Sequence, residues 1–530
     1  MTERTQVLIT GAGPVGLSTA LFLARRGIRP LVVERRAALS SIPRATGLHA
    51  RTMELFRTAG LEDPIRDAGL KIVGPDQETE LVRAGRATPL VMLGARSLAE
   101  LRESFVLESH DVPYADFSPS WPIWCGQDHY EPLIHDAAVA AGAEVRFGTA
   151  LTGLSQDADG VTATLDQGET VRADYLVGAD GVKSTVRDLV GIGQRSHGSA
   201  GHFVSIIFRA KIELPDDAPR FTLIYLMNPA AQGLLLYIEP GRWMFGVNYY
   251  PERGQSPADF TRERCVEYAR IAAGDPHLDV DVESYTPWDA THMVADGYRA
   301  GRVFLAGDAC HAHPPAGGFG VNAGVQDAHN LAWKLAAVLR GEAGPALLDT
   351  YQAERHPIGA ATADQAWMLF RSRGRLAEED RDRYRDFVVV TMGYRYDSAA
   401  VEGAPPDAEV LPRALSFTGE PGSRVPHGWV VRDGARVSTI DLFTDDLTLV
   451  AAPGGGAWAD SAARVAAELG VPLRAYRLGV DLIDPDAGWQ AAAGLDHGGA
   501  LLVRPDGIVA WRATGPGAEH DVPLRRLLAR

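Results

Sequence analysis

Short runs of apolar residues alternate along the chain with longer stretches that are apolar or amphipathic. This pattern predicts alternating strands and helices. Residues 7–9 form a short apolar run, and an Ala- and Leu-rich stretch at 17–26 follows after a glycine-rich turn. A second apolar run at 30–33 ends in an acidic residue. Short runs that are apolar throughout are typical of parallel strands covered by helices. The start of the chain therefore predicts an α/β fold.

Further along the chain the pattern changes twice. Four segments read as strands of a second sheet, and after them 362–385 is expected to be largely helical, with a possible break at Gly374. A Pro-, Ala- and acid-rich segment at 403–412 indicates a linker, and alternating strands and helices follow it. The four segments are 203–208, 221–227, 233–238 and 243–249, and the elements after the linker are 447–451, 458–469, 473–478 and 500–510.

Composition narrows the possible functions. The 530 residues carry a net charge of −16, whereas non-specific nucleic-acid binding needs a basic face. The chain shows no signal peptide and no apolar run long enough to span a bilayer. Cys125, Cys265 and Cys310 are too few and too scattered for a disulfide framework or a zinc site. We expect a cytoplasmic protein without a nucleic-acid partner, a membrane partner or a metal.

The turn after the first strand has the spacing G-x-G-x-x-G, and Glu34 ends the second strand. The first glycine permits a tight turn, the second lets a pyrophosphate approach the helix, and the third allows close helix–strand packing. The acid can accept hydrogen bonds from an adenosine ribose. The segment predicts a site for NAD or FAD. Its residues are Gly11, Gly13, Pro14, Val15, Gly16, Glu34 and Arg35.

A second glycine-rich loop lies late in the chain, before a helix expected to begin near Asn322. Gly307 and Asp308 open this loop, and Gly318 and Gly320 would let the backbone approach a ligand. The N-terminus of the following helix would direct unpaired N–H groups and its positive dipole end at that ligand. A planar ring with a negatively charged edge would suit such a site.

A third segment has Asp180 and Gly181 after an apolar strand, with Ser184 placed to cap the next helix. Taken alone, it is an ordinary turn between a strand and a helix. The three segments in this order resemble the signature of the class A FAD-dependent aromatic hydroxylases, the para-hydroxybenzoate hydroxylase superfamily. The whole chain is similar to the members that hydroxylate aromatic polyketides.

The resemblance implies particular contacts with FAD. Asp308 corresponds to the residue that contacts the ribityl chain, and Arg44 to an arginine that helps to hold the pyrophosphate. Gln127 corresponds to a glutamine that opens a helix and contacts FAD. The full implied set is Gly11, Gly13, Pro14, Val15, Gly16, Glu34, Arg35, Arg44, Gln127, Asp180, Gly181, Gly307, Asp308, Pro315, Gly318, Gly320, Val321 and Asn322. His311 and His313 are expected to have structural roles in the loop.

The resemblance also implies a Rossmann-like FAD-binding domain with an inserted substrate-binding β-sheet domain and a C-terminal thioredoxin-like domain. The expected division is 1–190 and 296–360 for FAD binding, 191–295 for the substrate sheet, 361–403 for a helical connector and 404–530 for the last domain. No cysteine follows Cys310, which excludes thiol–disulfide chemistry there. The expected substrate pocket is lined by Phe221, Tyr225, Leu235, Tyr237, Phe245, Pro315 and Phe319.

The implied function is a monooxygenase that uses FAD, NADPH or NADH, and O₂. A flavin C4a-hydroperoxide would hydroxylate a polycyclic phenolic substrate of polyketide type, with no catalytic side chain assigned. Two alternatives remain open: Baeyer–Villiger oxygen insertion on a related polyketide, and a flavin protein that sequesters an aromatic compound without turnover. The chain is expected to act as a monomer or a homodimer.

Overall fold

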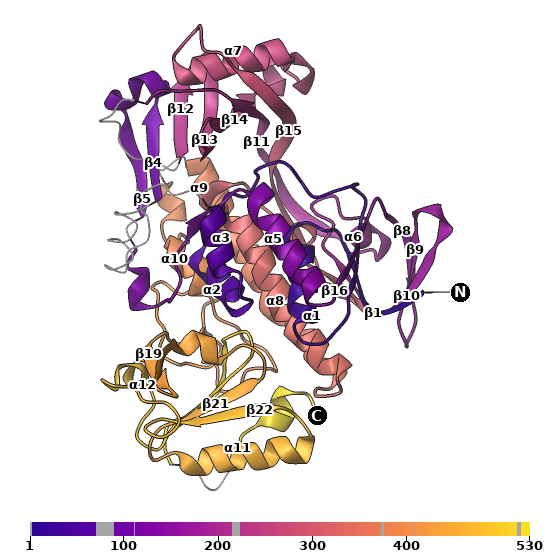
Figure 1. Ribbon diagram of the computed structural model, residues 1–530, viewed down its shortest axis with the longest axis vertical. Helices are drawn as coiled ribbons and strands as arrows, with labels where there is room; N and C mark the ends of the chain where they lie inside the picture. Colours follow the sequence, from indigo (N-terminus) through magenta and orange to yellow (C-terminus); the bar gives the residue numbers. More distant parts are fainter. Residues whose placement is uncertain are drawn as a thin grey trace.

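The structure, a computed structural model, describes residues 3–69, 90–110, 112–214, 223–372, 376–405, 407–516 and 521–530. A β-sheet covered by α7 lies at one end of the long axis, and a C-terminal α/β unit lies at the other (Figure 1). A central α/β unit, crossed by the long helix α8, lies between them (Figure 1). Among the described residues, no helix combines the length and apolar composition that a membrane span requires.

The central sheet is built around parallel strands in the order β17-β10-β1-β2-β7, with β16 antiparallel at one edge and the β8–β9 hairpin attached to β10. The first strand begins at Glu3, earlier than predicted, and the predicted strand–helix–strand start is confirmed. The strands are β1 (Glu3–Thr10), β2 (Leu31–Glu34), β7 (Glu144–Phe147), β8 (Leu151–Gln156), β9 (Val161–Leu165), β10 (Thr170–Gly178), β16 (Arg299–Ala300) and β17 (Val303–Leu305).

Helices of the central unit pack together, with α1 in contact with both α5 and α8. Because α1 is buried along almost its whole length, its apolar composition reflects a core position. The helices are α1 (Pro14–Ala24), α2 (Ala50–Thr58), α3 (Glu62–Ala68), α5 (Gln127–Ala140), α6 (Thr185–Leu189) and α8 (Phe319–Leu339), and a small ribbon pairs β3 (Gly47–Leu48) with β6 (Ile123–Trp124).

The second sheet has the strand order β18-β15-β11-β14-β13-β12-β4-β5. Its longest strands, β11 and β15, pair over most of their length and extend toward the central unit (Figure 1). Helix α7 (Arg262–Ala273) packs against the apolar face of this sheet. The strands are β4 (Leu90–Ala95), β5 (Phe105–His110), β11 (Gln194–Arg209), β12 (Leu223–Asn228), β13 (Ala231–Glu239), β14 (Arg242–Tyr249), β15 (Asp281–Ala295) and β18 (His311–Ala312).

The segment 362–385, predicted to be largely helical with a possible break at Gly374, is α-helical to Ser372. Gly374 lies outside the described residues, and 376–385 holds only the short 3₁₀ turn Glu378–Asp380, so helix was wrongly predicted for that last part. Helix α9 (Asp349–Ser372) begins earlier, and the chain later returns alongside it. The Gln365 side chain holds this return, because its amide donates to the Arg383 carbonyl at 2.7 Å and accepts from the Arg385 N–H at 3.0 Å. A short buried helix, α10 (Phe387–Met392), then packs against α2 and α8.

The C-terminal unit has a four-stranded sheet in the order β22-β21-β23-β24. Strands β21 and β22 are parallel and joined through α11, and the last two strands are antiparallel. The mixed α/β class predicted for the chain is therefore confirmed. The elements are β19 (Trp429–Arg432), β20 (Ala435–Ser438), β21 (Leu447–Ala451), α11 (Gly456–Leu469), β22 (Leu473–Arg477), α12 (Gly488–Ala492), β23 (Ala500–Val503), β24 (Val509–Ala513) and α13 (Leu524–Leu527).

Candidate functional site

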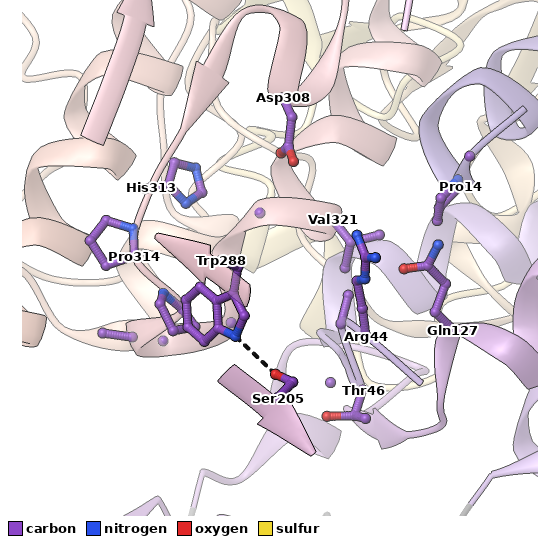
Figure 2. Close-up of a pocket in the computed structure, with 18 of the residues that line it drawn as sticks. Pro14, Arg44, Thr46, Gln127, Ser205, Trp288, Asp308, His313, Pro314 and Val321 are labelled. Atoms are coloured by element: carbon purple, nitrogen blue, oxygen red, sulfur yellow. Dashed lines mark hydrogen bonds between the residues drawn. The ribbon is translucent and has the colours of Figure 1, made fainter. Parts of the chain in front are cut away.

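A cavity of about 1200 Å³ lies between the central unit and the second sheet. The residues at the carboxyl ends of four parallel strands line it, namely Thr10 of β1, Glu34 of β2, Ala179 after β10 and Ala306 after β17. The carboxyl ends of the strands are where open α/β sheets bind ligands. Side chains from the second sheet close the opposite wall, as Trp288 and Ser205 do in Figure 2.

The glycines of the turn after β1 have two different roles, close packing and space for a ligand. At Gly11, which has φ of 98°, a Cβ would lie 2.4 Å from the Ala179 carbonyl oxygen, and at Gly16 a Cβ would lie 1.9 Å from the Gly11 carbonyl oxygen. A Cβ at Gly13 would meet no atom within 4 Å, and Gly13 lines the cavity. Gly11 and Gly16 therefore allow the turn to form, whereas Gly13 leaves room for a ligand.

The Glu34 side chain holds this glycine-rich turn in place. Its carboxylate accepts hydrogen bonds from the N–H of Ala12 at 2.8 Å and from the N–H of Arg36 at 2.9 Å. Both Glu34 and Arg35 line the cavity. The carboxylate thus ties the turn to the end of β2 and still borders the space that a ribose would occupy.

The loop before α8 contains two consecutive left-handed residues, Gly317 with φ of 76° and Gly318 with φ of 61°. Helix α8 begins directly after them at Phe319, so the predicted start near Asn322 is wrong by one turn. The reason is that Gly318 itself caps the helix, a position that a Cβ would strain.

Asn322 lies inside the first turn of α8, and its amide joins three parts of the chain. It donates to the carbonyls of Gly47 at 2.9 Å and Gly318 at 2.8 Å, and it accepts from the N–H of His49 at 2.8 Å. Asn322 is buried and does not line the cavity. Its position indicates that it aligns the start of α8.

Of the helices that begin at the cavity within the described residues, three have a glycine at the N-cap. The N-cap residues of α1, α5 and α8 are Gly13, Gly126 and Gly318, and none of them supplies a side-chain cap. Uncapped N–H groups and the positive ends of helix dipoles favour a bound anion. Arg44 lines the same space and has no ion-pair partner among the described residues. Burial and the nearby Arg36 lower the pKa of Arg44. The arrangement fits the phosphates of a dinucleotide.

Asp308 points into the cavity (Figure 2). Burial raises the pKa of its carboxyl, while the charges of His311 and Arg44 act in the opposite direction. The loop behind it is anchored by buried Asp327, whose carboxylate binds His311 Nε2 at 2.7 Å and Arg355 Nε at 2.6 Å. His311 therefore has the structural role expected of it. His313 instead lines the cavity, and burial lowers its pKa to about 3, which keeps the imidazole neutral.

Asp180 and Gly181 border the cavity after β10. The Asp180 carboxylate accepts from the Ser184 hydroxyl at 2.5 Å and from the Val186 N–H at 3.0 Å. Ser184 in turn caps α6 by accepting from the Arg187 N–H, as predicted. These bonds hold the turn rigidly at the edge of the cavity.

Most of the residues expected to contact FAD lie together in this one cavity. Those that line it are Gly11, Gly13, Pro14, Val15, Glu34, Arg35, Arg44, Gln127, Asp180, Gly181, Asp308, Pro315, Gly318, Gly320 and Val321. Gly16, Gly307 and Asn322 lie behind its wall. A Cβ at Gly307 would lie 2.8 Å from a methyl group of Val15, so this glycine permits the loop to pack against α1.

The expected substrate-pocket residues divide between the two faces of the second sheet. Tyr225 and Pro315 line the cavity. Leu235, Tyr237 and Phe245 lie on the other face of the sheet and pack toward α7. The reason is the two-residue period of a strand, because Leu234 and Leu236 of the same strand point into the cavity.

Two further expected pocket residues have other positions. Phe319 is buried against Phe387, with ring centroids 5.8 Å apart, and does not line the cavity. Phe221 lies outside the described residues.

Several cavity-lining residues were missed from the sequence. The rings of Phe203 and Trp288 stack with centroids 4.6 Å apart and an interplanar angle of 16°. The Trp288 indole N–H donates to the Ser205 hydroxyl at 2.8 Å (Figure 2). Met244 and Asn248 also line this wall. Alternation along β11, β14 and β15 was the available signal, but it does not say which face meets the cavity.

Comparison with known proteins agrees with this geometry. Residues 4–366 match a family model described as an FAD binding domain, and residues 418–530 match one described as the C-terminal part of aromatic-ring hydroxylases. The chain is 47% identical to tetracenomycin B2 monooxygenase-dioxygenase of Streptomyces olivaceus, with 99% of this chain and 98% of the relative covered. It is 40% identical to an aklavinone 12-hydroxylase of Streptomyces purpurascens, with 100% and 99% covered.

Solved structures give the same result. A ternary complex of aklavinone-11 hydroxylase with FAD and aklavinone matches with a TM-score of 0.87 at 39% identity, and both chains are covered completely. The flavin-dependent monooxygenase PieE, in complex with FAD and substrate, matches with a TM-score of 0.83 at 30% identity, with 99% of each chain covered.

Proposed function

The chain belongs to the FAD-dependent aromatic-ring hydroxylases, and from that membership we propose that it hydroxylates a polycyclic aromatic substrate of polyketide type in the cavity described above. The predicted family, the FAD cofactor and the monooxygenase class are confirmed by the matches at 4–366 and 418–530 and by the relatives. The polyketide substrate is supported by relatives named for tetracenomycin and aklavinone.

The proposal rests on one observation. A single cavity contains both the residues expected to bind the dinucleotide and a flat aromatic wall. Gly13 and Arg44 border one part of it, and the stacked pair of Phe203 and Trp288 borders another. A planar ligand gains most from contact with flat aromatic faces. The cavity therefore offers adjoining places for a flavin and for a fused-ring substrate.

When bound, FAD supplies the chemistry, since it accepts a hydride from NAD(P)H and activates O₂ for transfer to an aromatic ring. The protein holds and orients it. We assign the pyrophosphate to the start of α1 and to Arg44, the ribose to Glu34 and Arg35, and the ribityl chain to Asp308. Gln127 and the Asp180–Gly181 turn would complete the contacts near the centre of the cofactor.

The start of α8 is assigned to the pyrimidine edge of the ring system. Gly318, Gly320 and Val321 border the cavity there, and the N-terminus of α8 has no side-chain cap. A helix N-terminus stabilises negative charge, and that edge carries negative charge in the reduced cofactor. The backbone at the start of α8 would thus favour the reduced state.

The second sheet would hold the substrate and exclude water. Tyr225, Leu234 and Met244 line the wall beside the aromatic pair, and Ser205 and Asn248 supply polar groups within it. No side chain is assigned as a catalytic acid or base.

The domain division, the nicotinamide co-substrate, the oligomeric state and the cellular location are also part of the proposal. The division into 1–190 with 296–360, 191–295, 361–403 and 404–530 remains a proposal. It follows the separate sheets and hydrophobic clusters in outline, but β4 and β5, within 1–190, belong to the second sheet. NADPH or NADH is expected to bind transiently, and the protein to act as a monomer or homodimer. A cytoplasmic location suits the three free cysteines.

The test is oxidation of NAD(P)H by the FAD-loaded protein in the presence of a panel of polycyclic phenols. We expect at least one of them to accelerate NAD(P)H oxidation and to yield a product heavier by one oxygen, hydroxylated on a ring carbon. A ring-expanded ester product would instead identify Baeyer–Villiger insertion. If none of the phenols accelerates NAD(P)H oxidation, the result would contradict the proposed hydroxylation.

A further inference from the structure

Three side chains that can bind a metal converge outside the flavin cavity, where α9 packs against the paired strands β11 and β15. His197 comes from β11, His292 from β15 and Asp364 from α9. Their ligand atoms all lie within 4.8 Å of one another. Because the three residues come from three elements, only the folded chain brings them together.

The distances fit one small ion. The Oδ1 atom of Asp364 lies 3.2 Å from His292 Nε2 and 3.7 Å from His197 Nε2. Two ligand atoms that each lie about 2.1 Å from a tetrahedrally bound zinc ion are roughly 3.4 Å apart. These two distances lie on either side of this value, and the ligand nitrogens of the two imidazoles lie within 4.8 Å of each other, so side-chain rotations could bring all three ligand atoms to one ion.

The surroundings hold the ligands and leave an approach. His197 lies at a register shift between β11 and β15, next to Gly198 with φ of 87°, and this irregularity sets the direction of its ring. The His292 side chain is 3% exposed, whereas those of His197 and Asp364 are 55% and 42% exposed. The indole of Trp367 lies within 5.7 Å of both imidazoles, measured between ring centroids. The cluster is thus anchored on one side and open to solvent on the other.

The charge at the site is also suitable. Arg383 Nη2 lies 3.9 Å from the second oxygen of Asp364, Oδ2, which leaves Oδ1 directed at the two imidazoles. Two imidazoles and one carboxylate are ligands that Zn²⁺ and related divalent ions prefer, and water commonly completes such a site.

We propose that His197, His292 and Asp364 bind one divalent transition-metal ion, with Zn²⁺ as the reference ion, and that this ion fixes α9 to β11 and β15. Leu369 and Phe370, one turn further along α9, line the flavin cavity. The ion would therefore stiffen one wall of the cavity from outside, and it takes no part in the oxygen chemistry. The proposal does not depend on the identity of the substrate.

The test is titration of the chelator-treated, FAD-loaded protein with ZnCl₂ by calorimetry. We expect one ion per chain for the wild type, at least about 100-fold weaker binding for His197→Ala and Asp364→Asn, and unchanged binding for His202→Ala. His202 is the matched control, since it forms a pair with Asp289 at 2.6 Å but lies outside the cluster of three ligands.

A second readout separates binding from general loss of structure. Zn²⁺ should raise the thermal midpoint of the wild type and of His202→Ala, but not that of His197→Ala, whose FAD content and circular dichroism should match the wild type. The proposal is overturned if the wild type binds no ion stoichiometrically, or if His202→Ala weakens binding as much as His197→Ala does.

Discussion

At the residue scale, glycines and histidines show how one side chain can serve folding or binding. Gly13 and Gly16 belong to the same motif, yet only Gly13 has free space where a Cβ would lie. Both His313 and His329 have strongly lowered pKa values, but half-buried His313 lines the cavity whereas His329 is buried away from it. The spacing of residues along the sequence does not distinguish Gly13 from Gly16, or His313 from His329.

Alanine at the two glycines should therefore have different effects. Gly13→Ala should weaken FAD binding at least about tenfold, because its Cβ enters the ligand space, while destabilising the FAD-free protein by only about 1 kcal/mol or less through the poorer N-cap. Gly16→Ala should destabilise the FAD-free protein by about 2 kcal/mol or more, because its Cβ meets the Gly11 carbonyl. Flavin titration and thermal unfolding would measure the two effects. Equal loss of stability in both variants would contradict this division.

The stability should depend on pH through His329. Its ring lies 4.6 Å from that of Phe22, between α8 and α1, and burial lowers its pKa to about 3. An unfolded histidine binds a proton near pH 6.5, so the unfolded state takes up the proton first as the pH falls. The free energy of unfolding attributable to His329 should thus be about 2 kcal/mol lower at pH 5 than at pH 7.5.

Urea unfolding of the wild type and of His329→Gln at both pH values would measure this contribution. The variant should show a pH difference smaller than that of the wild type by about that amount. An identical pH difference in the two proteins would show that His329 does not carry it.

At the element scale, the start of α8 is set by the elements around it. The sequence predicted the helix and its role at the ligand, but placed its start at Asn322 instead of Phe319. It also predicted strands such as β13 and could not choose which face meets the cavity, because alternation is the same for a core and for a pocket. The packing of α7, the next α-helix in the chain, covers one face of the sheet and so decides which face meets the cavity.

Removing the Asn322 side chain should disturb the alignment of α8. Asn322→Ala would leave the buried N–H of His49 and the carbonyl of Gly47 without their partners. We expect a loss of about 2–3 kcal/mol in stability and weaker FAD binding, measured by unfolding of the FAD-free protein and by flavin titration. Unchanged FAD affinity would mean that α8 does not depend on this residue for its position.

At the scale of the whole molecule, buried ion pairs join the C-terminal unit to the rest. Glu354 of α9 binds Lys334 of α8 at 2.7 Å and Arg504 of the C-terminal unit at 2.6 Å, with all three side chains at most 1% exposed. Burial acts to raise the pKa of Glu354, but Arg504 and Lys334 outweigh it and lower the pKa. A second buried pair joins Glu54 of α2 to Arg424.

Neutralising Glu354 should therefore be costly. Glu354→Gln leaves buried Lys334 without its carboxylate and leaves Arg504 with Asp506 alone, and we expect a loss of about 3–5 kcal/mol in stability, measured by urea unfolding. The control is Glu213→Gln, which breaks the exposed pair with Lys211 and should change stability by less than about 0.5 kcal/mol. Similar losses in both variants would contradict a special role for the buried network.

These long-range contacts mark the limit of what the sequence could predict. Local motifs indicated the candidate flavin site, because the residues of each motif lie close together in the sequence. The pairing of Glu354 with Arg504, and the meeting of His197, His292 and Asp364, depend on how distant elements pack. The sequence therefore predicted no metal, since spacing along the chain gave no indication that these three residues meet.

The buried pairs restrict how this gene can recombine with those of its relatives. A crossover in the linker before the C-terminal unit would bring in a new partner for Glu54 and for Glu354 in a single event. A donor that supplies arginines at both positions 424 and 504 would complete both pairs. One that lacks either would leave Glu54 with Arg51 alone or Glu354 with Lys334 alone. We therefore expect the C-terminal segment to be exchanged without loss of stability only among relatives that share these charges.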